Sequence, residues 1–223
     1  MYEEIHLNIP QKYKRTGETY DIPVSLKSFP KLKIFQQQTD FGPVMKLLPT
    51  LLRLQHKAIV ITLDDDIAYS THDLALILEA LAHYKYEAVA ARGTFNHSSI
   101  DPILKQHRPV ALRQGDKLRD IAEGYALVGY PSWLADAKAI LDFSQLTKQC
   151  FQSDDLVISY ALALHSVPRI NIHANKDPPH LTALSYGLGS DALHVMQSHV
   201  KAYKGCAKSI RDLLASSQTP QQE

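Results

Sequence analysis

The stretch Ala58-Ile59-Val60-Ile61-Thr62-Leu63 runs directly into Asp64-Asp65-Asp66, and this junction decides how the chain is interpreted. The stretch from Ala58 to Leu63 is short, rich in β-branched residues and apolar on both faces. This pattern is typical of a central strand covered by helices on each side. Three adjacent carboxylates repel one another unless solvent or a cation screens them. The junction therefore predicts a buried strand that ends in an acidic cluster.

Segments with strand patterns alternate with segments of helical spacing on both sides of this junction. This order predicts an α/β fold with an open, mostly parallel sheet flanked by helices. Ligands bind such sheets beyond the carboxyl ends of the strands, which is where the acidic cluster falls. The expected strands are 4–9, 32–35, 87–91, 124–130 and 169–172. The expected helices are 44–52 (kinked or restarted at Pro49), 71–81 (N-capped by Thr71) and 154–165. A long loop is expected over 94–117.

Length and composition favour one soluble domain. The chain has 223 residues, and we expect a single domain over 1–215 with a disordered Ser/Gln-rich tail over 216–223. With 24 basic and 23 acidic residues, the formal net charge is +1, which predicts no nucleic-acid partner.

The cysteine count and the hydropathy of the sequence indicate in which cellular compartment the protein resides. Two cysteines, Cys150 and Cys206, cannot make a disulfide framework, and they fit a reducing compartment or indifference to redox conditions. No signal peptide or apolar run of membrane-spanning length is present in the sequence. These features predict a cytoplasmic protein without a transmembrane segment, and they leave peripheral membrane association open.

The acidic triplet has a structural and a functional interpretation. It could be a solvated turn, but at the ligand-binding edge of a sheet it favours a site for a hard cation such as Mg²⁺ or Mn²⁺, which takes oxygen ligands. Two enzyme classes use such a cluster. They are metal-dependent nucleotide-sugar glycosyltransferases and phosphohydrolases that attack with the first aspartate.

Several ordered motifs separate these classes. The segments 39–51 (TDFGPVMKLLPTL) and 61–69 (ITLDDDIAY) resemble bacterial glycosyltransferases of the GT-A fold, whose pattern D-Y-G-P-x-T-K-L-L-P precedes a strand ending D-D-D-I-x-Y. The similarity continues in Gly124-Tyr125-Ala126, in 150–159 (CFQSDDLVIS) and in 185–194 (SYGLGSDALH), and it extends from Glu4 to about Leu214. Members of this family begin with a further strand and helix, so the resemblance implies an N-terminally truncated GT-A-like domain.

The resemblance also implies an activity and roles for residues. It implies metal-dependent transfer of a sugar, with inversion, from a UDP- or GDP-linked donor to a hydroxyl of a glycan or lipid-linked glycan acceptor. Asp155 is the favoured base, with Asp154 close behind, although both also suit the first turn of a helix capped by Ser153. Asp66 is the expected principal ligand of Mn²⁺ or Mg²⁺, with Asp64 and His194, and the expected donor-binding residues are Asp40, Lys46, Asp64, Asp65 and Arg92.

Two alternatives stay open at this point. One is a phosphohydrolase in which Asp64 is the nucleophile and Asp66 the acid/base. The other is a non-catalytic or decayed glycosyltransferase-like domain that binds a glycan or a partner, which the truncation motivates.

Overall fold

A mixed five-stranded sheet forms the centre of the protein. The computed structural model describes residues 3–14, 16–94, 110–135, 148–172, 182–183, 203–210 and 212. The strand order is β3-β9-β5-β10-β7, and only the β5–β10 pair is parallel. These strands are β3 (Val60–Thr62), β9 (Val128–Tyr130), β5 (Ala88–Ala90), β10 (Arg169–Asn171) and β7 (Lys117–Leu118).

The expectation of a mostly parallel sheet was therefore wrong, although the α/β class is confirmed. Strands β3 and β5 do run in the same direction and are joined through a helix, as the alternation predicted. However, β9 lies between them and is antiparallel to both. Local periodicity reveals neither the order nor the direction in which strands pair, because both depend on contacts distant in sequence.

Strand β3 also occupies a different place from the expected one. Among the described strands it pairs only with β9, so it is an edge strand and not the central one. Its apolar flanks are partly exposed, with Ile59 at 46% and Leu63 at 37%. The apolar pattern correctly identified a strand but overestimated its burial.

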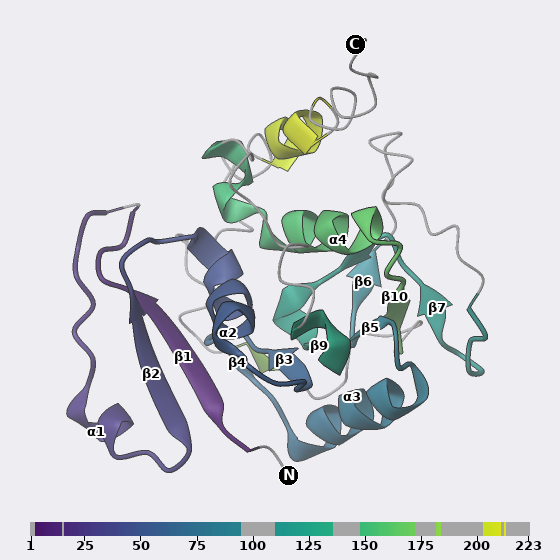
Figure 1. Cartoon of the computed structure of the whole chain (residues 1–223), viewed down its shortest axis with the longest axis horizontal. Coiled ribbons are helices and arrows are strands. Elements are labelled where there is room, and N and C mark those ends of the chain that lie inside the picture. The colour runs from purple at the N-terminus through teal and green to yellow at the C-terminus, as the bar shows by residue number, and fades with distance from the viewer. Residues whose placement is uncertain are drawn as a thin grey trace.

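A second sheet consists of two parallel strands, β1 (Ile5–Pro10) and β2 (Leu32–Gln37). The connection between them contains the short helix α1 (Val24–Lys27). Figure 1 shows this pair beyond α2 (Leu48–Arg53), with β1 on the side nearer the central sheet. Two further antiparallel pairs are β4 (Ile67–Ala68) with β11 (Thr182–Ala183), and β6 (Gly93–Thr94) with β8 (Ile121–Ala122).

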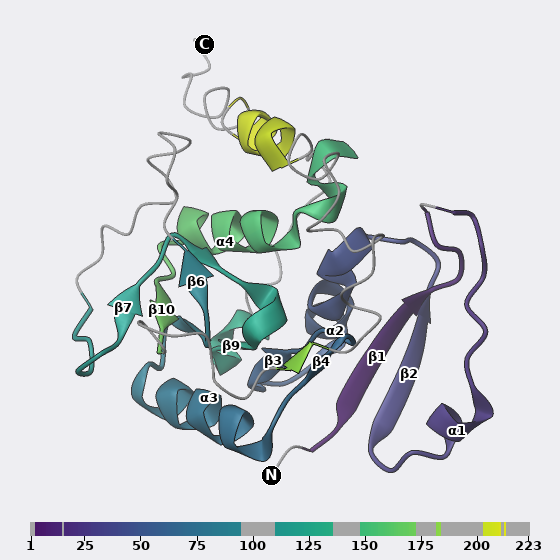
Figure 2. The same ribbon diagram turned by 180° about the vertical axis from the view of Figure 1, so that it is seen from behind.

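Helices cover both faces of the central sheet. Figures 1 and 2 show α3 (Thr71–His83) on one side and α4 (Asp154–Leu164) on the other. The alternation within β5 explains the two layers, because Ala88 and Ala90 pack with α4 whereas Val89 packs with α3. The layer of α4 also includes α2 and the 3₁₀ helix η1 (Gly42–Lys46).

Two helix boundaries follow from local chemistry. The N-cap of α3 is Ser70 and not the expected Thr71, because the Ser70 hydroxyl accepts the Asp73 N–H while the Asp73 carboxylate accepts the Ser70 N–H. The helical run breaks at Leu47, between η1 and α2, and Pro49 stands in the first turn of α2, where proline is tolerated; this agrees with the break expected at Pro49.

The remaining expectations have mixed outcomes. The strand expected over 124–130 begins instead as the 3₁₀ helix η2 (Gly124–Ala126) and becomes β9 only at Val128. Cys150 and Cys206 form a disulfide, a pairing that the cysteine count did not anticipate. Most of the loop expected over 94–117, and the tail 216–223, lie outside the described residues. None of the described helices is long and apolar enough to cross a membrane.

The close packing of α3 on β9 gives a first prediction. A Cβ atom at Gly129 would lie 2.6 Å from side-chain carbons of both Ile77 and Leu81. Gly129→Ala should therefore lower the free energy of unfolding by about 1–3 kcal/mol, measured by urea denaturation. In a Leu81→Ala background the same substitution should cost less, and an unchanged cost would contradict this packing.

Candidate functional site

A compact charged cluster forms just beyond the end of β3. The Lys46 Nζ atom lies 2.5 Å from Asp64 Oδ1, to which it donates a hydrogen bond, and 2.9 Å from Asp154 Oδ2 in an ion pair. Lys46 ends η1, Asp64 follows β3, and Asp154 opens α4. Three segments separated by up to 108 positions thus meet at one ammonium group.

A fourth segment completes the cluster through its backbone. The Gly124 N–H donates a hydrogen bond of 2.7 Å to Asp155 Oδ1. A Cβ atom at Gly124 would lie 2.8 Å from both that oxygen and Lys46 Nζ, so a larger residue would push into the cluster. Gly124 therefore permits the close approach of η2 to the first turn of α4.

Burial and the mutual interaction of the charges shift the pKa values in the cluster. Burial raises the pKa of the Asp155 carboxyl well above its ordinary range, and the neighbouring Asp154 charge raises it further. Burial also raises the pKa of Asp64, despite the opposing effect of Lys46. For Lys46, burial favours a lower pKa, but the three carboxylates outweigh burial and raise it well above its ordinary value. One ammonium thus faces Asp64, Asp154 and Asp155.

Tyr69 ties two of the site segments together. Its hydroxyl accepts the Asp64 N–H at 2.9 Å and donates to the Tyr125 carbonyl at 2.6 Å. Burial raises the pKa of Tyr69, which keeps this phenol protonated. Shortly after Tyr125, Leu127 adopts a φ of +70°, a conformation that is costly for a residue with a side chain.

Arg92 lies close to these segments but outside the cluster. Its Nε atom is 2.9 Å from Glu123 Oε2, and its guanidinium lies over the Tyr125 ring at 5.7 Å from the ring centroid. The Arg92 side chain remains 39% exposed while it is paired with Glu123.

The other predicted site residues have different positions. Asp40 accepts backbone N–H groups from Gly42 and Lys14, so it shapes the start of η1 and is not in the cluster. Asp65 is exposed, whereas Asp66 is half-buried and near enough to Asp64 for its charge to raise that pKa. His194 lies outside the described residues.

Sequence reasoning missed some residues that support the charged cluster, and it misjudged the capping role of one residue. Tyr69 and Gly124 belong to quoted motifs, but only the folded chain shows that they support Asp64 and Asp155. Tyr203 is a further neighbour, since burial together with the charges of Asp155 and Glu123 raises its pKa to about 12. Ser153 does occupy the N-cap position of α4, but its side chain makes no capping hydrogen bond.

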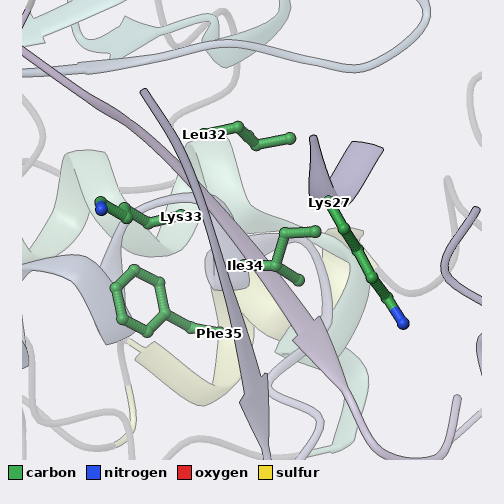
Figure 3. A pocket seen from close by; sticks show the side chains of 5 residues that line it. All are labelled: Lys27, Leu32, Lys33, Ile34 and Phe35. Atoms are coloured by element: carbon green, nitrogen blue, oxygen red, sulfur yellow. The ribbon is translucent and has the colours of Figure 1, made fainter. Parts of the chain in front are cut away.

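A shallow groove lies away from this cluster, on β2. It has a volume of about 260 Å³ and is lined by Lys27, Leu32, Lys33, Ile34 and Phe35. Figure 3 shows Lys33 and Phe35 on one side of the strand, with Ile34 and Lys27 on the other. The groove contains none of the predicted site residues.

Comparisons with known proteins add no family to this description. No protein-family model matches the chain, and no curated protein matches its sequence.

The shared ammonium gives a prediction about stability. Lys46→Met should lower the free energy of unfolding by about 3–5 kcal/mol, because it leaves buried carboxylates without their counter-charge. Urea denaturation at pH 7.5 measures the loss. The exposed Lys85→Met is the matched control and should change stability by less than about 0.5 kcal/mol. Equal effects of the two variants would contradict the arrangement.

The raised pKa of Asp155 gives a prediction with a pH dependence. A carboxyl whose pKa is raised in the folded protein destabilises it increasingly as pH rises through that pKa. Asp155→Asn removes this charge but keeps an oxygen for the Gly124 N–H, so the variant should melt at least ~2 °C higher than wild type at pH 8. The difference should shrink as pH falls below ~4, the ordinary pKa of an aspartate, because the wild-type carboxyl then becomes protonated in both states. A lower melting temperature for Asp155→Asn at pH 8 would contradict this sign.

Proposed function

We propose that this protein is a glycosyltransferase of GT-A type that moves a sugar from a nucleoside-diphosphate donor to a hydroxyl of a glycan acceptor, with inversion at the sugar carbon. One observation carries the proposal. Asp64, at the end of a sheet strand, and the Asp154–Asp155 pair, at the start of α4, share the Lys46 ammonium in one cluster. The resemblance assigns donor binding to the segment of Asp64 and proton acceptance to the Asp154–Asp155 pair. A transfer reaction requires these two groups to be adjacent.

Binding of the donor diphosphate requires positive charge. The chain could supply this charge through basic side chains and through a divalent ion held by carboxylates. Lys46 supplies a fixed positive charge that can face a diphosphate, and Arg92, paired with Glu123, is a partly exposed second cation near η2. Asp64 and Asp66 supply carboxylate oxygens, which suit Mg²⁺ or Mn²⁺. No set of three His, Cys, Asp or Glu side chains among the described residues is placed to hold a metal by itself. Such ions often take one or two carboxylates and complete their shell with phosphate oxygens and water, so the donor set fits an ion that arrives with a diphosphate.

The acceptor side calls for a base. One carboxyl oxygen of Asp155 is engaged by the Gly124 N–H, which leaves the other for the acceptor hydroxyl. Burial raises the pKa of Asp155, and a carboxylate with a higher pKa is a stronger base. The acceptor oxygen then bonds to the sugar carbon while that carbon's bond to the diphosphate breaks, and the proton passes to Asp155. A bound divalent ion would stabilise the charge developing on the leaving diphosphate.

Binding and turnover can be tested separately. With saturating Mn²⁺ and UDP or GDP, the melting temperature should rise by several degrees, since a ligand that binds only the folded state stabilises it by mass action. Nucleoside diphosphate released from a panel of nucleotide sugars measures turnover. Asp155→Asn should abolish release but retain the thermal shift, whereas Asp64→Asn should reduce both.

The control is Asp21→Asn, in the exposed connection between β1 and α1, which should leave both measurements unchanged. Loss of the thermal shift in Asp155→Asn would make this residue a ligand or a structural group and not the base. If no nucleoside diphosphate up to millimolar concentration shifts the wild-type melting temperature, the proposal fails in favour of a non-catalytic domain.

The contact between Lys46 and Asp64 also favours a second candidate, a phosphohydrolase with Asp64 as nucleophile, since such an enzyme requires a lysine near its aspartates. However, such an enzyme also requires a later acidic pair at the end of a strand, whereas Asp154 and Asp155 open a helix. Hydrolysis of p-nitrophenyl phosphate with Mg²⁺, lost in Asp64→Asn, would favour this candidate over transfer.

A further inference from the structure

A disulfide ties the C-terminal helix to the segment that precedes the acidic turn. Cys150 lies in the 3₁₀ helix η5 (Lys148–Gln152), and Cys206 lies in the helical segment 203–210. Both cysteines are buried, with exposures of 4% and 0%. Figures 1 and 2 show the helical segment, in yellow, beside the chain that leads into α4.

The η5 segment contacts two elements of the charged cluster. The Cys150 carbonyl accepts the Ser153 N–H at 3.1 Å, which holds the residue just before Asp154 and Asp155. The Phe151 carbonyl lies so close to Gly42 that a Cβ atom there would collide with it, and Gly42 has a φ of +70°. Because Gly42 opens η1, which carries Lys46, a displacement of η5 affects both sides of the Lys46 ion pairs.

The helical segment 203–210 packs tightly beside the bridge. Cys206, Ala207 and Ile210 form its buried face within the core that also contains Leu156 of α4. A Cβ atom at Gly205 would lie against the end of the Gln149 side chain, so this segment and η5 are also in contact next to the bridge. Near the start of the segment, Tyr203 lies within electrostatic reach of Asp155 and Glu123.

This helix depends on its attachments. Most of the stability of a helix in a protein comes from the packing of one face and not from its own propensity. Its order therefore comes from packing and from the covalent bridge to η5. The bridge links positions 56 apart in sequence, so it is the covalent tie between segment 203–210 and η5.

We propose that the Cys150–Cys206 disulfide is a redox-sensitive latch that holds the helical segment 203–210 against η5, so that reduction releases this segment and loosens the turn carrying Asp154 and Asp155. A dithiol reductant breaks the S–S bond and donates two electrons and two protons. Two cysteine thiols form, and the dithiol becomes its own disulfide. The latch does not depend on the proposed glycosyl transfer.

Hydrogen exchange of the whole protein, followed by mass spectrometry, tests the latch without substrate or activity. Oxidised protein is compared with protein reduced by dithiothreitol. Amides of 203–210 should exchange at least tenfold faster after reduction, and those of Ser153 and Val157 at least threefold faster. The amides of Ala88 and Ala91, which donate to carbonyls at the sheet, should not change.

The matched variant replaces both cysteines by serine and should behave like the reduced wild type. Adding dithiothreitol to this variant should change nothing further, which controls for side effects of the reductant. The wild-type comparison stands by itself if the variant folds poorly.

Three results would overturn the latch. One is unchanged exchange of 203–210 after reduction. Another is equal acceleration at Ala88 and Ala91, because the bridge would then stabilise the whole domain and not one segment. The last is titration of two free thiols in protein prepared without reductant.

Discussion

The arrangement of the site depends on one buried ammonium group. Lys46 contacts Asp64 and Asp154 directly, and its charge also acts on Asp155, so groups from the end of β3 and the start of α4 are held around a single cation. Without it, mutual repulsion would separate these carboxylates or force them to take up protons. The carboxyl groups outnumber the ammonium, so the cluster holds more acidic groups than one cation can neutralise. That excess suits the binding of a further cation and the acceptance of a proton.

Neutral groups hold the cluster in shape. The Tyr69 hydroxyl joins the Asp64 backbone to the Tyr125 carbonyl, and the Gly124 N–H fixes one oxygen of Asp155. These bonds set the relative positions of the β3 turn, η2 and α4. Fixed donors of this kind need little reorganisation when charge develops, which is the property that acid–base and electrostatic catalysis require. The raised pKa of Asp155 is the cost of this arrangement in stability.

Prediction from sequence succeeded where local pattern determines the outcome. The helical spacing of 154–165 matches α4, the β-branched run at 58–63 contains β3, and the helical run breaks next to Pro49 as expected. It failed where distant pairing decides. The insertion of β9 between β3 and β5 makes the sheet mostly antiparallel and leaves β3 at an edge. An apolar run indicates that a strand is partly buried, but it does not indicate which strands lie beside it.

For the site, sequence alone established which residues carry charge, that Asp64–Asp66 follow a strand, and that Asp154 and Asp155 open a helix. Tertiary structure decided which of them meet. It placed Asp64, Asp154 and Asp155 around Lys46, assigned Asp40 to the backbone of Gly42, and joined Cys150 to Cys206. The physical reason is the range of the forces involved. Backbone propensity and capping act over a few neighbouring residues, whereas ion pairs and disulfides form between any segments that packing brings together.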